Sequence, residues 1–161
     1  MALSFNSLAQ GNHYYSNNTL HDPYGKFQVS FPEEPKYSSQ DIDIAGGSVR
    51  MYQFMYETAN SVLMVSYVDY PESQIAGQDM DALLKKAAGG FIGQLKLTSK
   101  SETIINYGVH KGILFYADNG SMYTVMRDYI VKNRLYQVGI LQYGAVDIKV
   151  ENEFFDSFVL Q

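Results

Sequence analysis

Apolar and polar residues alternate over two segments near the start of the chain. The first segment, 27–31, reads Phe-Gln-Val-Ser-Phe and ends at Pro32, which cannot donate a hydrogen bond to a sheet. Residues 37–44 alternate again, and longer strands rich in apolar residues are predicted over 49–58 and 62–70. Gly46-Gly47 and Ala59-Asn60 separate the later segments as turns, so the pattern predicts antiparallel strands joined by hairpins.

The period changes to a helical one between residues 80 and 95. Apolar side chains recur there at helical spacing, at Met80, Leu83, Leu84, Ala87, Ala88, Phe91, Ile92 and Leu95. Asp79 and Asp81 lie at the start, where the helix dipole favours negative charge. Gly89, Gly90 and Gly93 interrupt the helix, and we expect them to let its backbone approach a sheet closely.

A second group of strands follows this helix. The pattern predicts strands over 102–108, 111–117, 121–131 and 134–142. Asp118-Asn119-Gly120 is typical of a tight hairpin, because Asn and Gly tolerate positive φ. Gly144 precedes a final helix, which the pattern predicts over 145–158.

Several strands carry apolar or aromatic residues on both sides. In 62–70 one side is Val62, Met64, Ser66 and Val68, and the other is Leu63, Val65 and Tyr67. A sheet with one wet face would show a polar row, so we expect both faces to be covered. The sequence therefore predicts an α+β fold in which α-helices cover the faces of one antiparallel β-sheet, an α/β/α sandwich.

Length and composition agree with one globular domain. The 161 residues include no cysteine, which excludes disulfides and thiolate metal sites. Twelve Lys and Arg against seventeen Asp and Glu give a net charge of −5, so we expect no nucleic-acid partner. No apolar run is long enough for an integral membrane segment.

The first residues bear on the compartment. Ser7-x-Ala9 before Gln10 fits the small-x-small pattern of a signal-peptidase site. We therefore expect 1–24 to be an N-terminal arm or the remnant of a signal peptide, with 25–161 as a single domain. Residues 11–25 have no period, which predicts an extended or partly ordered lead-in. The expected location is periplasmic or secreted, with a cytoplasmic location as the alternative.

Short motifs resemble those of the Mog1/PsbP-like family. Gly25-Lys26-Phe27-Gln28-Val29-Ser30-Phe31-Pro32 is similar to that family's opening strand. Segments 133–138 and 154–158 are similar to its last strand and C-terminal helix. The resemblance implies an antiparallel sheet between helices and a non-catalytic accessory role bound to a larger partner. It carries no catalytic residue over to this chain.

The chain shows no catalytic or metal-binding motif. Phosphate-binding loops, a G-x-S-x-G elbow and H-E-x-x-H are absent from the sequence. His13, His21 and Asp22 could ligate a metal, but they lie in the lead-in without a rigid element to fix them. We therefore expect no catalytic residue, no metal and no cofactor.

Two sets of carboxylates have a simple structural interpretation. Asp41 and Asp43 point to one side of their strand, as on the wet face of an edge strand. Asp147 and Glu151 are spaced as on an exposed helical face, and so are Lys149 and Glu153.

Tyrosine is unusually frequent, with fourteen residues and no Trp. Tyrosines can belong to the core, or together with arginine they can form a recognition surface. The candidates for a partner- or ligand-binding face are Arg50, Tyr52, Tyr123, Arg127, Tyr129 and Tyr136. Arg127 lies within an apolar strand, so we expect it to find a carboxylate or a ligand anion, and our hypothesis is a buried acid of the same chain.

These observations favour a non-catalytic interaction domain that binds a protein partner. The alternative is a small-ligand carrier with an apolar pocket between sheet and helix, for which the glycine-containing helix would leave room. An enzyme is the least favoured class, because no nucleophile and base converge.

Overall fold

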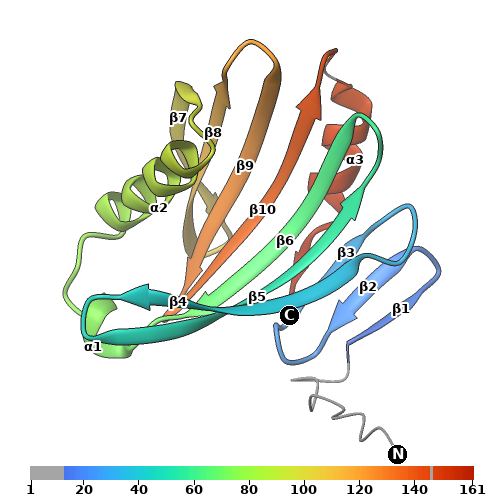
Figure 1. Cartoon of the computed structure of the whole chain (residues 1–161). Coiled ribbons are helices and arrows are strands. Elements are labelled where there is room, and N and C mark those ends of the chain that lie inside the picture. Colours follow the sequence, from blue (N-terminus) through green and yellow to red (C-terminus); the bar gives the residue numbers. More distant parts are fainter. Residues whose placement is uncertain (1–12, 146) are drawn as a thin grey trace, which may run out of the picture.

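The computed structural model describes residues 13–145 and 147–161, and most of these residues form antiparallel strands (Figure 1). The strands are β1 Tyr14–Ser16, β2 Thr19–Asp22, β3 Phe27–Ser30, β4 Lys36–Ile44, β5 Gly47–Glu57, β6 Ser61–Asp69, β7 Thr98–Tyr107, β8 His110–Asp118, β9 Met122–Val131, β10 Arg134–Tyr143 and β11 Val159–Leu160. The helices are α1 Glu72–Ile75, α2 Met80–Gln94 and α3 Ile148–Ser157. Strand and helix segments together confirm the α+β class, and each predicted strand and helix is present within a few residues of its expected ends.

The large sheet has seven strands in the order β4-β5-β6-β10-β9-β8-β7. Two up-and-down meanders build it, one from β4 to β6 and one from β7 to β10. They meet where β6 pairs with β10, in a register that places Val65 opposite Val138. All other pairings in this sheet join strands that are consecutive in the chain.

The small sheet contains four strands in the order β1-β2-β3-β11. Its first hairpin turns at Asn17 and Asn18, both with positive φ, at 50° and 57°. Residues 13–25 therefore contain regular strands where an extended or partly ordered lead-in was expected, because β2 pairs with β3 along its whole length. The folded body begins before residue 25 and includes this hairpin.

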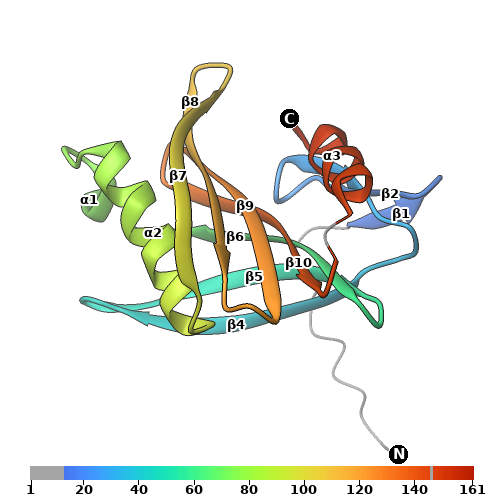
Figure 2. The same cartoon turned by 90° about the horizontal axis from the view of Figure 1, so that it is seen from above.

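The two faces of the large sheet are covered in different ways. Helix α2 packs on β7, β8 and β9, whereas α3 and the small sheet cover the opposite face (Figure 2). Strands β6 and β9 are buried on both faces, as their sequence pattern predicted, and β10 is buried on both faces as well. Strand β5 differs, because α2 does not extend over it, and Met51, Gln53 and Met55 remain partly exposed.

The glycines of α2 do not bring its backbone close to the sheet. Gly89, Gly90 and Gly93 are exposed, and a Cβ added at any of them would meet no atom within 4 Å. The buried side of the helix is formed instead by Leu84 and Ala88, each fully buried, together with Ile92. The expectation of close approach at the glycines was therefore wrong.

Helix α3 is shorter than the predicted segment and begins after a capping residue. The Asp147 carboxylate accepts hydrogen bonds from the backbone N–H groups of Lys149 and Val150. Lys149 and Glu153 form the expected exposed pair. Glu151 was expected on an exposed face but is buried, because it turns toward the large sheet with Phe154 and Phe155.

Within the part of the chain that the structure describes, no helix has the length and apolar character needed to cross a membrane. The Ser7 and Ala9 pattern lies outside the described residues.

Candidate functional site

Two neighbouring rows of side chains cross the large sheet, one on each face. On the face toward α3, four tyrosines occupy directly opposed positions on β5, β6, β10 and β9. This tyrosine row consists of Tyr52, Tyr67, Tyr136 and Tyr129. All four are buried, with at most 5% of their surface exposed.

The tyrosine row holds the turn between β2 and β3. Tyr67 Oη donates a hydrogen bond of 3.0 Å to Asp22 Oδ2, and Tyr136 Oη donates one of 2.6 Å to the carbonyl oxygen of Gly25. The second Asp22 oxygen accepts from the backbone N–H groups of Tyr24 and Gly25. Burial, with the nearby Asp22 charge, raises the pKa of Tyr67 far above its ordinary range. These contacts anchor the small sheet and leave no open surface.

Arg134 completes this anchor. Its guanidinium donates to both carboxylate oxygens of Asp69, at 2.6 and 2.7 Å, and to the carbonyl oxygen of Tyr24 at 2.7 Å. It also lies 4.8 Å from the centre of the Tyr67 ring, a cation–π arrangement. All three guanidinium nitrogens therefore donate a hydrogen bond to groups around this turn.

The six residues predicted as a binding face lie on the α3 side of the sheet without forming one exposed patch. Tyr52, Tyr129 and Tyr136 belong to the core, because the small sheet and α3 cover them. Arg50 is exposed and ion-paired with Asp41 at 2.9 Å, two residues before Tyr52 on the same face of β5. The prediction of an accessible Tyr and Arg surface is corrected to a buried anchor with Arg50 at its edge.

The remaining two predicted residues, Tyr123 and Arg127, lie under α3. The Arg127 guanidinium lies 4.6 Å from the centre of the Phe155 ring. Burial raises the pKa of Glu151, and the Arg127 charge partly opposes that rise. Arg127 makes no ion pair within 4 Å among the described residues, so its principal partner is an aromatic ring and not the expected acid.

The histidines of the N-terminal hairpin stack on aromatic rings. His13 lies 4.8 Å from Tyr37, and His21 lies 4.6 Å from Tyr14, as measured between ring centres. Asp22 is bound by Tyr67, as described above. Residues 13–145 and 147–161 contain no group of three or more acidic or histidine side chains that could hold a metal.

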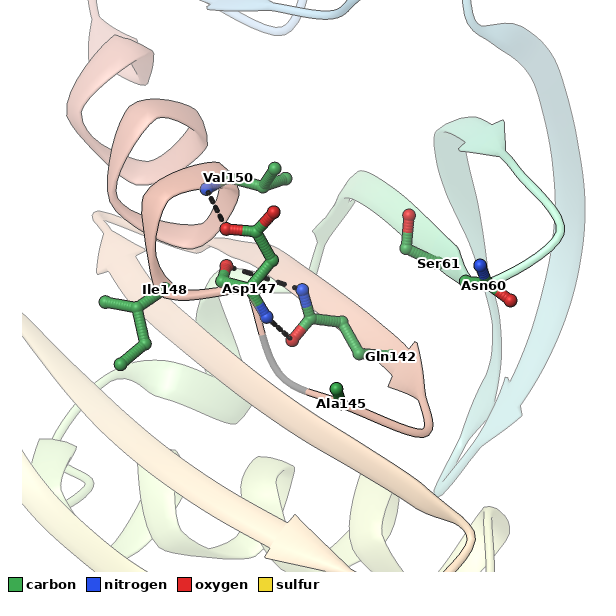
Figure 3. Close-up of a pocket in the computed structure, with 7 residues that line it drawn as sticks. All are labelled: Asn60, Ser61, Gln142, Ala145, Asp147, Ile148 and Val150. Carbon is green, nitrogen blue, oxygen red and sulfur yellow. Dashed lines mark hydrogen bonds between the residues drawn. The ribbon is translucent and has the colours of Figure 1, made fainter.

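A hollow of about 550 Å³ lies where β10 leads into α3 (Figure 3). Its polar groups bind one another: Gln142 Oε1 accepts from the backbone N–H of Asp147 at 3.2 Å, and the Asp147 carboxylate caps the helix. Asn60 and Ser61, from the turn between β5 and β6, lie across from them. None of the buried unpartnered side-chain atoms of the described residues lines this hollow, so it is a weak candidate for a specific site.

The stronger candidate lies on the other face of the large sheet, toward α2. One register position away from the tyrosine row, five polar residues face each other in an unbroken line across β4, β5, β6, β10 and β9. This polar row consists of Ser38, Gln53, Ser66, Gln137 and Asp128. Directly opposed residues of antiparallel strands lie on the same face and within contact range, so these side chains form one continuous track.

The polar row ends at a buried acid. Asp128 has no exposed surface, and burial raises the pKa of its carboxyl to about 7, which a hydrogen bond from Gln137 opposes. Gln137 Nε2 donates that bond to Asp128 Oδ2 at 3.1 Å. Asp128 Oδ1 and Ser66 Oγ are buried and have no hydrogen-bond partner among the described residues. Unpaired buried polar atoms are costly and rare in folded proteins, which makes them a mark of a binding site.

Methionines flank the polar row on both sides. Met55, Met64 and Met126 lie along one side, and Met51 lies along the other. Thioether side chains are flexible and polarizable, and they are frequent at adaptable binding surfaces. The row therefore combines fixed polar groups with deformable apolar walls.

The polar row is open toward solvent at three of its residues. Ser38 is exposed, Gln53 and Gln137 are partly exposed, and Gln137 donates a hydrogen bond to Asp128. Tyr70 stands near the buried end, because burial and the charge of Asp128 both raise the pKa of its hydroxyl. The surface thus reaches to within one side chain of the buried acid.

Asp128 was not among the site residues predicted from the sequence. The available signal was an acidic residue inside a strand, between the apolar residues Met126 and Ile130 on the same side. A charged residue inside an apolar strand needs a partner, and this reasoning, which selected Arg127, applies equally to Asp128.

The fold and site together define an α+β protein built on an antiparallel sheet, with a buried acid at the end of a polar row. The chain matches no protein-family model, no curated protein and no solved structure.

Proposed function

We propose that the chain is a non-catalytic interaction domain that binds a protein partner along the free edge of its large sheet. The observation that carries the proposal is β4. This strand pairs with β5 in unbroken register over nine residues, and among the described residues no strand lies on its other side. Such an edge offers a row of backbone N–H and C=O groups to an extended segment of another protein.

The opposite edge of the sheet supports the choice of β4. Strand β7 carries a register shift between Ser99 and Ser101, with Lys100 at the shift. Bulges and lysines are devices that protect an edge from pairing. Strand β4 contains no such shift, and its exposed Asp43 favours a basic partner segment, whereas Asp41 is paired with Arg50.

The carrier alternative has less support. The layer between α2 and the sheet is filled by buried side chains, among them Leu84, Ala88, Ile113 and Phe115. A carrier would need a cavity of several hundred Å³ in that layer. The partner-binding function is therefore preferred.

The fold family and the cellular location are further parts of this proposal. The resemblance at 25–32 supports a Mog1/PsbP-like α/β/α sandwich, in which α2 and α3 lie on opposite sides of the sheet. A location in the cell envelope rests on the cleavage pattern at Ser7 and Ala9, with the cytoplasm as the alternative. The family role of an accessory protein agrees with binding through a sheet edge.

Site-specific photo-crosslinking in the native host tests the proposal. We expect a crosslinker at Ser39 of β4 to give a discrete adduct with another protein, and the same crosslinker at Ser101 of β7 to give none. Ser39 and Ser101 are both exposed serines on edge strands, so the two positions are matched. Equal labelling at both positions, or no adduct at Ser39, would contradict the proposal.

Proline substitution adds a second measurement. Consecutive residues of an edge strand direct their N–H groups alternately toward the neighbouring strand and toward solvent. With the crosslinker placed at Ser38, which is also exposed, so that Ser39 can be varied, we expect one of the adjacent variants Ser39→Pro and Gln40→Pro to keep the fold and lose the adduct, because only an outward N–H is removed. An adduct that persists in the folded variant would argue against pairing through the backbone.

A further inference from the structure

The buried end of the polar row has chemistry that the edge-strand proposal does not use. Asp128 Oδ1 and Ser66 Oγ are buried without a partner, although each lies within a continuous track of polar side chains. Gln137, between them in the register, uses its amide N–H on Asp128. A ligand that donates hydrogen bonds would satisfy both atoms.

We propose that the polar row binds an organic cation, an alkylammonium or alkylguanidinium group, with Asp128 as its counter-ion. This site is independent of partner binding at β4.

The charge balance around Asp128 favours a cation. An ionised carboxylate can only accept hydrogen bonds, and among the described residues no Lys or Arg lies within ion-pair distance of it. Arg127 is next to it in sequence but lies on the opposite face, over Phe155. Arg134 is bound to Asp69. A buried acid of this kind is stabilised in its charged form by a cation that the ligand supplies.

The other members of the row fit the same chemistry. The Ser66 hydroxyl and the carbonyl oxygens of Gln53 and Gln137 are acceptors for the several N–H groups of an ammonium or guanidinium. The methionines Met51, Met55 and Met64 would lie against the alkyl part of the ligand. An anion is disfavoured because the row contains no positive charge.

The ligand has a path to Asp128 along the sheet. Helix α2 covers β7 to β9, and the row is partly exposed at Gln53 and Gln137. The side chain of Gln137 donates to Asp128 and lies between it and that open part, so under this proposal the charged group reaches Asp128 when Gln137 rotates.

Methionine methyl groups report on this site directly. We would label the full chain with ¹³C at the methionine methyls and titrate it with butylguanidinium and butylammonium, with butyramide as a neutral control. We expect saturable shifts of Met51, Met55 and Met64 with the two cations and none with butyramide. Met122, toward the other end of β9, is expected to shift little.

The matched variants are Asp128→Asn and Asp43→Asn. The first keeps the size of the side chain and an acceptor for Gln137 but removes the charge, and we expect it to weaken cation binding about tenfold or more. The second makes the same chemical change on the exposed edge strand and should bind like the unaltered protein. An unperturbed methyl spectrum of the free variant shows that Asp128→Asn folds.

A further titration, with a tripeptide, identifies whether the cation comes from a protein or from a small molecule. If the tripeptide Gly-Arg-Gly gives the same shifts as butylguanidinium, the site accepts an arginine side chain from a protein; if only the free cation binds, it accepts a small molecule. Both results support the proposal. The proposal is overturned if neither cation gives saturable shifts, or if Asp128→Asn binds as tightly as the unaltered protein. That outcome leaves the crosslinking at Ser39 unaffected, so the two proposals fail separately.

Discussion

Tyr67 Oη donates a 3.0 Å hydrogen bond to Asp22 Oδ2, and this bond joins the centre of the large sheet to the small sheet. Both side chains have about 1% of their surface exposed. The bond therefore lies where water cannot replace it.

Removing this hydroxyl should destabilise the protein. We expect Tyr67→Phe to lower the free energy of unfolding by about 1–3 kcal/mol, because a buried carboxylate oxygen loses its side-chain donor. Urea denaturation measures the change. Tyr116→Phe is the control, since the Tyr116 hydroxyl has no hydrogen bond among the described residues and should change stability little; equal losses in both variants would contradict the assignment.

Gly25 allows the turn at Asp22 to lie against the tyrosine row. A Cβ at this position would lie 2.7 Å from Asp22 Oδ2 and 2.8 Å from Tyr67 Cε1, and neither atom is free to move. We expect Gly25→Ala to lower the free energy of unfolding by about 2–4 kcal/mol. If Gly25→Ala lowers the free energy of unfolding by less than Tyr67→Phe does, the turn can move away from the sheet.

The burial of Asp128 gives stability a defined dependence on pH. Its pKa is about 7 in the folded protein, above the ordinary value of 3.8 that applies in the unfolded chain. The folded state therefore holds a proton that the unfolded state releases. The contribution of protonated Asp128 to the free energy of unfolding is fully present below about pH 4. It is lost as the pH rises to about 7, a change on the order of 4 kcal/mol.

Asp128→Asn should remove this dependence. We expect the free energy of unfolding of the variant, relative to the unaltered protein, to increase between about pH 4 and about pH 7. Asp43→Asn, at an exposed position, should show no such trend. A constant difference between Asp128→Asn and the unaltered protein over this range would mean that the acid does not titrate there.

Substitution by alanine should have opposite effects on stability at two glycines, one in a helix and one in a strand. Gly90 lies on the exposed side of α2 with open space around it, so we expect Gly90→Ala to raise the free energy of unfolding by about 0.5–1 kcal/mol. Gly139 lies in β10 directly under the buried Met126 sulfur, and a Cβ there would overlap it. We expect Gly139→Ala to cost about 1–3 kcal/mol, and thermal denaturation of both variants tests the contrast.

The sequence predicted the strands and the two long helices well, because each has a clear period and strong turn residues. The Asp118–Gly120 turn and the edge position of Asp41 and Asp43 followed from local chemistry alone. The hairpin β1–β2 was missed because its strands are short and rich in Asn, His and Tyr. Its signal was Asn17-Asn18, a pair that tolerates the positive φ of a tight turn.

The candidate site could not be read from the chain in the same way. The polar row exists only through the pairing of β6 with β10, which joins residues far apart in the sequence. Before that pairing is known, Ser66 and Gln137 are isolated polar residues in apolar strands. For the same reason, the tyrosines could not be assigned to core or surface until the small sheet was seen to cover them.

The junction of the two meanders has a consequence for how the molecule forms. Each meander contains only pairings between successive strands, which close quickly because the loops are short. The step that brings Ser61–Asp69 against Arg134–Tyr143 must instead close a loop containing α1, α2 and three strands. We expect this closure to limit the folding rate, so that weakening Val65 or Val138 slows folding, whereas changes at the outer edges mainly accelerate unfolding.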